Sequence, residues 1–289
     1  MEKKILTAAI ILTALISAKY AQADALSIYE IQYTTAVDGA SPQNGNIVDC
    51  KGGIVTHIRS GSRPRLVIQD PNYSEGWGAI QVKGWTSDVF NNIAIGDWVS
   101  LTNVLVEENA GTTFLQYEAE NNPNITIVSR NNKVPRPLIV TINEISTPSE
   151  GIDAWIIPDN TAEKYESMLI KVTNVHISDT GYGKAFDNYL LTSNTDPNLT
   201  CWASDYMNTD KEKGLIYHPY VEIGRNFCGV AGILEQYTGD SEGVFYDYYQ
   251  LLTINTKAFT IEQTADLDGD CDVDFADFSI FVEHWLEGR

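Results

Sequence analysis

Gly53-Ile54-Val55-Thr56-His57-Ile58 contains the β-branched residues that are typical of a strand, and runs of this kind indicate the fold class. Similar short runs follow at Arg65–Ile68 and Trp98–Leu101, and others stand at Leu169–Val172 and Val230–Leu234. No long segment of the body shows a helical period, and turn residues separate the runs. The sequence therefore predicts a mainly β protein built as a barrel or a sandwich.

An internal repeat is visible around these strands. Trp85-Thr86-Ser87-Asp88 in the first half recurs as Trp202-Ala203-Ser204-Asp205 in the second. Ile95-Gly96, followed by an apolar strand, recurs as Ile223-Gly224. Two copies of one β unit are therefore predicted. We expect the two repeated tryptophans to lie in the core, because repetition at equivalent points serves the fold.

The boundary between the copies is placed at residues 131–137, which combine two prolines with a polar run. This gives domains at 24–134 and 135–262, each of ordinary size for one domain. One large sandwich in place of two barrels stays open as an alternative at this point.

Composition limits the range of functions. The chain has 289 residues, of which 39 are acidic and 19 basic, for a formal net charge of −20. Apolar residues make up 43%, enough for a sizeable core. The acidic balance argues against a nucleic-acid ligand, since phosphate contacts need a surplus of Lys and Arg. It also argues against docking on an anionic membrane surface.

Residues 1–23 read as a secretory signal. Lys3 and Lys4 precede an apolar stretch from Ile5 to Ala18, and Ala21-Gln22-Ala23 supplies the small-x-small cleavage pattern. We expect a secreted, periplasmic or cell-surface protein with no membrane span after cleavage. A retained N-terminal anchor is the alternative. In an oxidising compartment cysteines pair, and Cys201 with Cys228 is the expected couple.

The C-terminal segment carries the most specific motif. Carboxylates fall at positions 1, 3, 5, 9 and 12 of the loop 266–277, and position 7 would offer a backbone carbonyl. This spacing suits Ca²⁺, which takes six to eight oxygen ligands, as in an EF-hand loop. Phe278, Phe281 and Trp285 then recur at helical spacing. The candidate metal ligands are Asp266, Asp268, Asp270, Asp272, Asp274 and Asp277.

The segment 264–289 resembles a single type I dockerin repeat, a calcium loop followed by one helix. The resemblance implies Asp266, Asp268, Asp270 and Asp277 as side-chain ligands and a cohesin-like or cell-surface protein as partner. A full dockerin has two repeats, and the chain has one. Cys271 stands where the loop usually has glycine.

The body resembles the OB-fold domains of exported bacterial proteins, which accompany secreted nucleases and phosphoesterases. Ser27–Tyr33, Ser41–Gly45 and Val48–Thr56 carry the resemblance in the first half. Arg136–Leu138 and Ala162–Glu166 carry it in the second. It implies two tandem five-stranded OB-like barrels, followed by the small calcium loop–helix module.

OB folds bind sugars or bases with exposed aromatic side chains. The candidate ligand residues are Trp77, Tyr246, Tyr248 and Tyr249. With so acidic a chain, a neutral glycan is the expected ligand rather than nucleic acid. No catalytic motif is evident, so we expect a non-catalytic binding or scaffold protein. An accessory or degenerate member of a secreted hydrolase system, nuclease or glycosidase, is the alternative.

Overall fold

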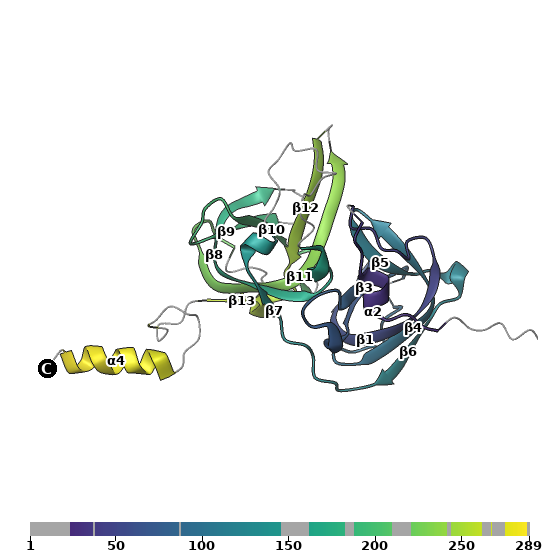
Figure 1. Ribbon diagram of the computed structural model, residues 1–289, viewed down its shortest axis with the longest axis horizontal. Helices are drawn as coiled ribbons and strands as arrows, with labels where there is room; N and C mark the ends of the chain where they lie inside the picture. The colour runs from purple at the N-terminus through teal and green to yellow at the C-terminus, as the bar shows by residue number, and fades with distance from the viewer. Residues whose placement is uncertain are drawn as a thin grey trace, which may run out of the picture.

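The computed structural model describes residues 24–36, 38–86, 88–145, 162–182, 188–209, 221–241, 244–261, 267 and 275–287. They form two β-barrels that contact each other, and Figure 1 draws a C-terminal helix apart from both. The predicted signal at 1–23 lies outside the described residues. Within them, no helix is both long and apolar enough to cross a membrane.

The first barrel, barrel 1, is one antiparallel sheet closed on itself, with a single parallel pair between β3 and β5. Its strands run in the order β1-β2-β3-β5-β4-β6, and pairing of β1 with β4 closes it. A short capped helix, α2 (Ile28–Gln32), packs Ile28 and Ile31 into the barrel core. The strands are β1 (Ile47–Arg59), β2 (Arg65–Gln69), β3 (Ala79–Gly84), β4 (Trp98–Asn109), β5 (Thr112–Tyr117) and β6 (Asn124–Ser129).

Two glycines let β1 pair with both β2 and β4. Gly52 has a φ of +77°, and a Cβ there would lie 1.6 Å from the carbonyl oxygen of Val99. A Cβ on Gly53 would lie 2.7 Å from the backbone of Gln69. Only glycine fits so close to neighbouring backbone, so the barrel closes at a point where β1 has no side chains.

The second barrel, barrel 2, repeats this plan with the order β13-β11-β12-β10-β9-β8-β7 and closure between β8 and β11. Its one parallel pair inside the closed barrel joins β10 to β12, the equivalent of β3 with β5. The strands are β7 (Leu138–Val140), β8 (Leu169–Tyr182), β9 (Asn188–Ser193), β10 (Thr200–Ser204), β11 (Asn226–Ser241), β12 (Val244–Leu252) and β13 (Phe259–Thr260).

The predicted repeat is confirmed at the second motif. Gly96 and Gly224 each stand two residues before a long strand and have φ of +89° and +85°. The amide of Gly96 donates to the carbonyl of Val55 on β1, at 2.9 Å, and that of Gly224 donates to Ile177 on β8, at 2.7 Å. Both barrels are therefore OB-like, each with five strands in the closed part, and the single-sandwich alternative is wrong.

Neither of the repeated tryptophans lies in a barrel core, where both were expected. Trp85 follows the end of β3, is 45% exposed and stacks on Tyr117. Trp202 lies within β10 and is half-buried, between Cys201 and Ala203, which point into the core. Because neighbouring strand residues point to opposite faces, Trp202 points out of the barrel. Core placement of Trp85 was wrong because the strand ends one residue before it.

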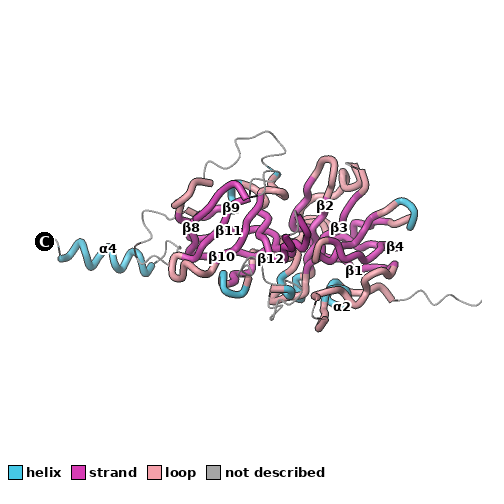
Figure 2. The backbone as a smooth tube through the Cα atoms, turned by 90° about the horizontal axis from the view of Figure 1, so that it is seen from above, coloured by secondary structure: helices cyan, strands magenta, loops and turns pink. Residues whose placement is uncertain are grey.

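The two barrels meet in a surface that we call the joint. Barrel 1 contributes the outer face of β2 and β3 and the β4–β5 hairpin, and barrel 2 contributes β11, β12 and the segments 163–169 and 206–207 (Figure 2). Val67 of β2 is fully buried there against Leu169, Met207, Ile233 and Leu252. Val67, Gln69 and Gln81 alternate with barrel-core residues, so β2 and β3 are apolar inward and contact barrel 2 outward.

Charged and aromatic side chains alternate through the joint. The guanidinium groups of Arg59 and Arg65 each lie over the ring of Tyr206, at 4.4 and 4.8 Å from its centroid. Arg65 also lies 4.9 Å from the centroid of Phe114, and Lys83 lies 3.6 Å from it. Arg65 forms a buried ion pair with Glu235 of β11, which also accepts from Gln81 at 3.1 Å.

The Arg65–Glu235 pair is therefore expected to hold the barrels as one unit. Removing one partner leaves a buried charge alone, so Arg65→Ala should lower the free energy of unfolding by about 3–5 kcal/mol. Urea denaturation of the chain measures this. Arg63→Ala, an exposed arginine of the β1–β2 loop, is the control and should change little. Equal stability of the two variants would contradict the role of the pair.

Candidate functional site

The joint covers the face of barrel 1 on which OB folds often bind ligands. In that fold the faces of the second and third strands bind oligonucleotides and oligosaccharides. Here Gln69 of β2 accepts from the amide of Leu169 at 3.4 Å, and Gln81 of β3 contacts Glu235. Barrel 2 therefore occupies the usual ligand face of barrel 1, and a site on barrel 1 has to lie elsewhere.

Two of the predicted tyrosines are buried. Tyr249 is 2% exposed in the core of barrel 2, and its hydroxyl donates to Glu163 at 2.7 Å. Tyr248 is 8% exposed and lies with its ring centroid 5.6 Å from that of Tyr237. Predicting Tyr249 as a ligand residue was wrong, because the β12 alternation turns it inward. The side chain of Tyr246 lies outside the described residues.

Trp77, in contrast, belongs to a group of surface rings that we call the aromatic cluster: Tyr29, Tyr33, Tyr73 and Trp77. Tyr29 stacks on Tyr33 at 5.1 Å and on Tyr73 at 4.7 Å between centroids, with 15° between planes in each pair. Trp77 meets Tyr33 edge to face at 5.5 Å. Tyr33 is 44% exposed and the other three are partly exposed, so the cluster opens to solvent.

Local sequence places each ring. Tyr29 and Tyr33 are four residues apart across α2, so they share one face while Ile28 and Ile31 anchor the other. Tyr73 ends the short 3₁₀ helix η1 (Pro71–Tyr73), which Asp70 caps through a 2.9 Å bond from the amide of Asn72. The sequence did not predict that the three tyrosines belong to this site, because about forty residues separate α2 from η1 and Trp77 and only the fold brings them together.

Trp77 is held in an unfavourable backbone conformation. Its φ is +61°, which is rare for a bulky residue. Its amide donates to the carbonyl of Lys164 in barrel 2 at 2.5 Å, and a Cβ on Gly76 would lie 3.2 Å from the Lys164 side chain. Strained residues of this kind occur at ligand sites and persist only where the surroundings enforce them. Contact with barrel 2 thus fixes a ring of the cluster.

The surroundings of the cluster are polar and acidic. Asn72, Ser74 and Glu75 are exposed next to Tyr73 and Trp77, and Glu30 lies on α2. The backbone amide and the hydroxyl of Ser27 both donate hydrogen bonds to the Glu30 carboxylate. These bonds keep the pKa of the Glu30 carboxyl below its usual value. Apolar ring surface flanked by hydrogen-bonding groups is the usual composition of a small-molecule site.

The predicted calcium loop can be placed in part. Asp266, Asp268, Asp270, Asp272 and Asp274 lie outside the described residues. Asp277 lies in the first turn of α4 (Phe275–Glu287), is 3% exposed, and accepts from the amide of Leu267 at 2.5 Å. Over the described ranges, no group of three or more His, Cys, Asp or Glu side chains is arranged to hold a metal ion.

The predicted Cys201–Cys228 bridge is wrong. Cys201 is a free thiol, and burial raises its pKa to about 12; Cys50 is likewise free. Cys201 lies in the core of barrel 2, whereas Cys228 follows the core residue Phe227 and points the other way. Cys228 is nonetheless disulfide-bonded. Its partner is not among the described residues.

No protein-family model matches the sequence, and no curated protein is similar to it. Among solved structures, an OB domain from Methanosarcina mazei is 18% identical, with a TM-score of 0.27, over 33% of this chain and 84% of that one. A murine DNA-binding protein with double-stranded DNA is 9% identical (TM-score 0.34; 71% and 95% covered). Fission yeast Pot1 with single-stranded DNA is 10% identical (TM-score 0.29; 88% and 99% covered).

Cysteine mapping tests the corrected pairing. Digestion of the unreduced protein should release a peptide pair that joins Cys228 to Cys271, since these are the cysteines left once Cys50 and Cys201 are free. Buried thiols of raised pKa should react with an alkylating reagent only after denaturation. A bridged peptide containing Cys201, identified by mass spectrometry, would contradict the assignment.

Proposed function

We propose that this chain is an exported, non-catalytic binding protein whose aromatic cluster contacts a neutral glycan. The observation that carries the proposal is the gathering of Tyr29, Tyr33, Tyr73 and Trp77 on one surface, with Trp77 held in a strained conformation. Such a conformation costs about 1–3 kcal/mol and is retained where it serves a purpose. Trp77 is partly exposed, so packing of the core does not require its strained backbone conformation.

Chemistry favours a sugar over a nucleic acid at this surface. The C–H faces of a pyranose are apolar and stack on aromatic rings, while the hydroxyl edges need donors and acceptors. Asn72, Ser74 and Glu75 offer such groups beside the rings. A phosphate backbone would meet Glu30 and Glu75 and a chain of formal charge −20. We therefore expect nucleic acid to be a poor ligand.

An active glycosidase would need a pair of reachable carboxylates, whereas an accessory or degenerate member of a secreted hydrolase system would not. The structure does bring Glu108, Glu163 and Glu166 together from both barrels. Glu163 and Glu166 are 3% and 2% exposed inside the joint, which leaves a substrate no path to them. This burial argues against catalysis at these carboxylates and is consistent with a binding role; an accessory or degenerate member of a secreted hydrolase system stays the alternative.

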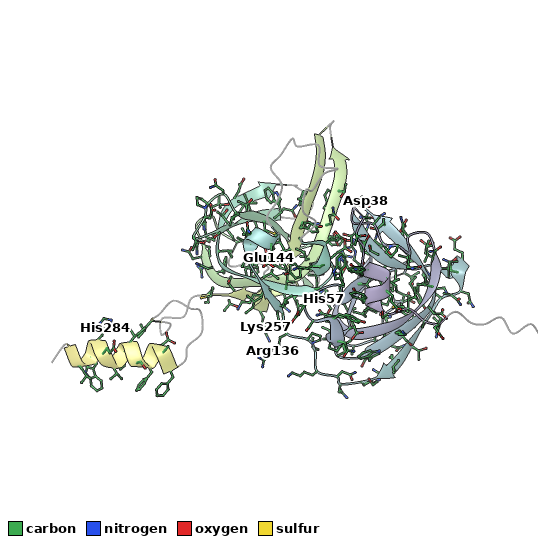
Figure 3. The ribbon with its side chains drawn as sticks, in the orientation of Figure 1. Asp38, His57, Arg136, Glu144, Lys257 and His284 are labelled. Atoms are coloured by element: carbon green, nitrogen blue, oxygen red, sulfur yellow. The ribbon has the colours of Figure 1, made fainter. Side chains whose placement is uncertain are left out.

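Export and docking complete the proposal. A disulfide at Cys228 suits a secreted, periplasmic or cell-surface protein. The helix α4 presents Phe275, Phe278, Phe281, Trp285 and Leu286, each more than half exposed (Figure 3 labels His284 on the same helix). An apolar stripe of this kind fits a cohesin-like or other cell-surface protein partner. We propose that Ca²⁺ in the preceding loop holds this helix for docking.

Binding should depend on the aromatic cluster. A neutral-glycan array should yield a ligand for the full mature chain, and Trp77→Ala should weaken its binding about tenfold or more in calorimetry, because a stacking surface is lost. Trp85→Ala is the matched control, since Trp85 also stacks on a tyrosine at the surface but outside the cluster. Absence of any glycan ligand, or equal loss in both variants, would count against the proposal.

Calcium should stabilise the C-terminal module. A ligand at a hundredfold excess over its Kd adds about 2.7 kcal/mol to the folded state. Asp277→Asn keeps an acceptor for the amide of Leu267 but removes the charge, so it should abolish most of the calcium heat in titration calorimetry. Asp274→Ala should lose less, because position 9 of such loops acts through water. Unchanged heats in Asp277→Asn would exclude this calcium site.

A further inference from the structure

Three glutamates meet inside the joint, and we call them the carboxyl cluster: Glu108, Glu163 and Glu166. Glu108 comes from β4 of barrel 1, and the other two come from the segment of barrel 2 that contacts it. Thr113 links the barrels: its hydroxyl donates to Glu108 at 2.5 Å and its amide donates to Glu166 at 3.1 Å. One residue of β5 thus connects two carboxyl groups across the joint.

Hydrogen bonds satisfy only part of this cluster. Glu108 also accepts from the amide of Ser41 at 2.8 Å. The first carboxyl oxygen of Glu166, Oε1, accepts from Gln32 at 3.3 Å as well as from Thr113. Its second oxygen, Oε2, is buried without a hydrogen-bond partner. A buried carboxylate with an unpaired oxygen is costly, whereas a protonated carboxyl group is far less so.

The charges around the cluster are negative. Glu163 and Glu108 act on Glu166, and Asp38, labelled in Figure 3, acts on Glu108. Among the described residues no basic group acts on Glu166 or Glu108: Lys164 acts on Glu144 and Tyr165, and Arg65 pairs with Glu235. Burial first, and these neighbours second, raise the pKa of Glu166 well above its usual range; burial also raises the pKa of Glu108.

We propose that the carboxyl cluster is a proton-dependent lock: the closed joint holds a proton on Glu166, and loss of that proton loosens the contact between the barrels. Deprotonation of Glu166 would add a negative charge beside Glu108 and Glu163 in a buried region shared by both barrels. Opening the joint to water relieves that repulsion, so alkaline conditions favour a looser arrangement.

The direction of the pH dependence follows from proton linkage. The folded-state pKa of Glu166 is raised, so its stabilising contribution is complete below the unfolded value of 4.5 and is lost as pH rises through the folded value. His57, also in the joint, donates from Nε2 to the backbone carbonyl of Met207 at 2.8 Å, and burial lowers the pKa of His57 to about 4. Its contribution has the opposite sign and is lost as pH falls from 6.5 towards 4.

The two groups can be separated by choice of pH. Lys83 in the joint has its pKa lowered to about 8, chiefly by burial, so it adds stability as pH rises above that value. Between about pH 6.5 and 8 neither His57 nor Lys83 changes much, and the carboxyl cluster should dominate the slope. Differences between a variant and the parent at the same pH also cancel contributions from groups that the substitution leaves alone.

The experiment uses thermal unfolding of the full mature chain across this range. Glu166→Gln replaces the protonated carboxyl with a neutral isostere, so its Tm should equal the parent's near pH 4 and exceed it by about 3 °C or more near pH 8. Glu120→Gln, an exposed glutamate on the 3₁₀ helix η2 (Ala119–Asn121), is the control and should show no growing difference. A Tm difference for Glu166→Gln that does not grow with pH would overturn the proposal.

Proton release from the parent protein gives a second readout that needs no variant. Unfolding in urea near pH 7.5, in weakly buffered solution, should release protons, because Glu166 holds a proton in the folded joint that it loses in the unfolded chain, while Lys83 and His57 take up only a small fraction of a proton at this pH. Uptake of protons, or no exchange, would overturn the proposal even if Glu166→Gln failed to fold.

Discussion

The ion pair between Arg65 and Glu235 is the constraint on which the arrangement of this protein depends. Both side chains are largely removed from water, so each needs the other, and each also contacts a neighbour from the opposite barrel or from an adjacent strand. Charges buried in this way add little net stability compared with an apolar pair, but they penalise any displacement heavily. The joint is therefore a specific contact, with one register between β2–β3 and β11.

This register decides where a ligand can bind. By covering the outer face of β2 and β3, barrel 2 removes the surface that an isolated OB fold would offer. The same contact brings Lys164 to Trp77 and so builds one edge of the aromatic cluster. Loss of one surface and creation of another have a common cause, and the cluster is a property of the pair of barrels rather than of barrel 1 alone.

Sequence patterns predicted the barrels and their repetition because both depend on local features. Gly96 and Gly224 each need a positive φ before a strand, and glycine at that offset is visible in the chain. The joint was invisible because its residues look like surface. Gln69, Gln81 and Glu235 are polar residues on strands in which polar and apolar residues alternate. Nothing in the local sequence distinguishes a polar side chain that faces water from one that faces another barrel. The aromatic cluster was found only through Trp77, for the same reason.

The β4–β5 hairpin shows what such a contact means for the integrity of the chain. At its tip, Ala110 accepts from the amide of Thr238, and a Cβ on Gly111 would lie 2.4 Å from the Thr238 hydroxyl. The covalent connection between the barrels runs separately, through 130–137, where the side chains are partly or fully exposed. If a protease cut this connection, the hairpin would stay in contact with barrel 2 and the two fragments would remain associated. The linker places the two barrels of one chain near each other, and the non-covalent contacts of the joint keep them together.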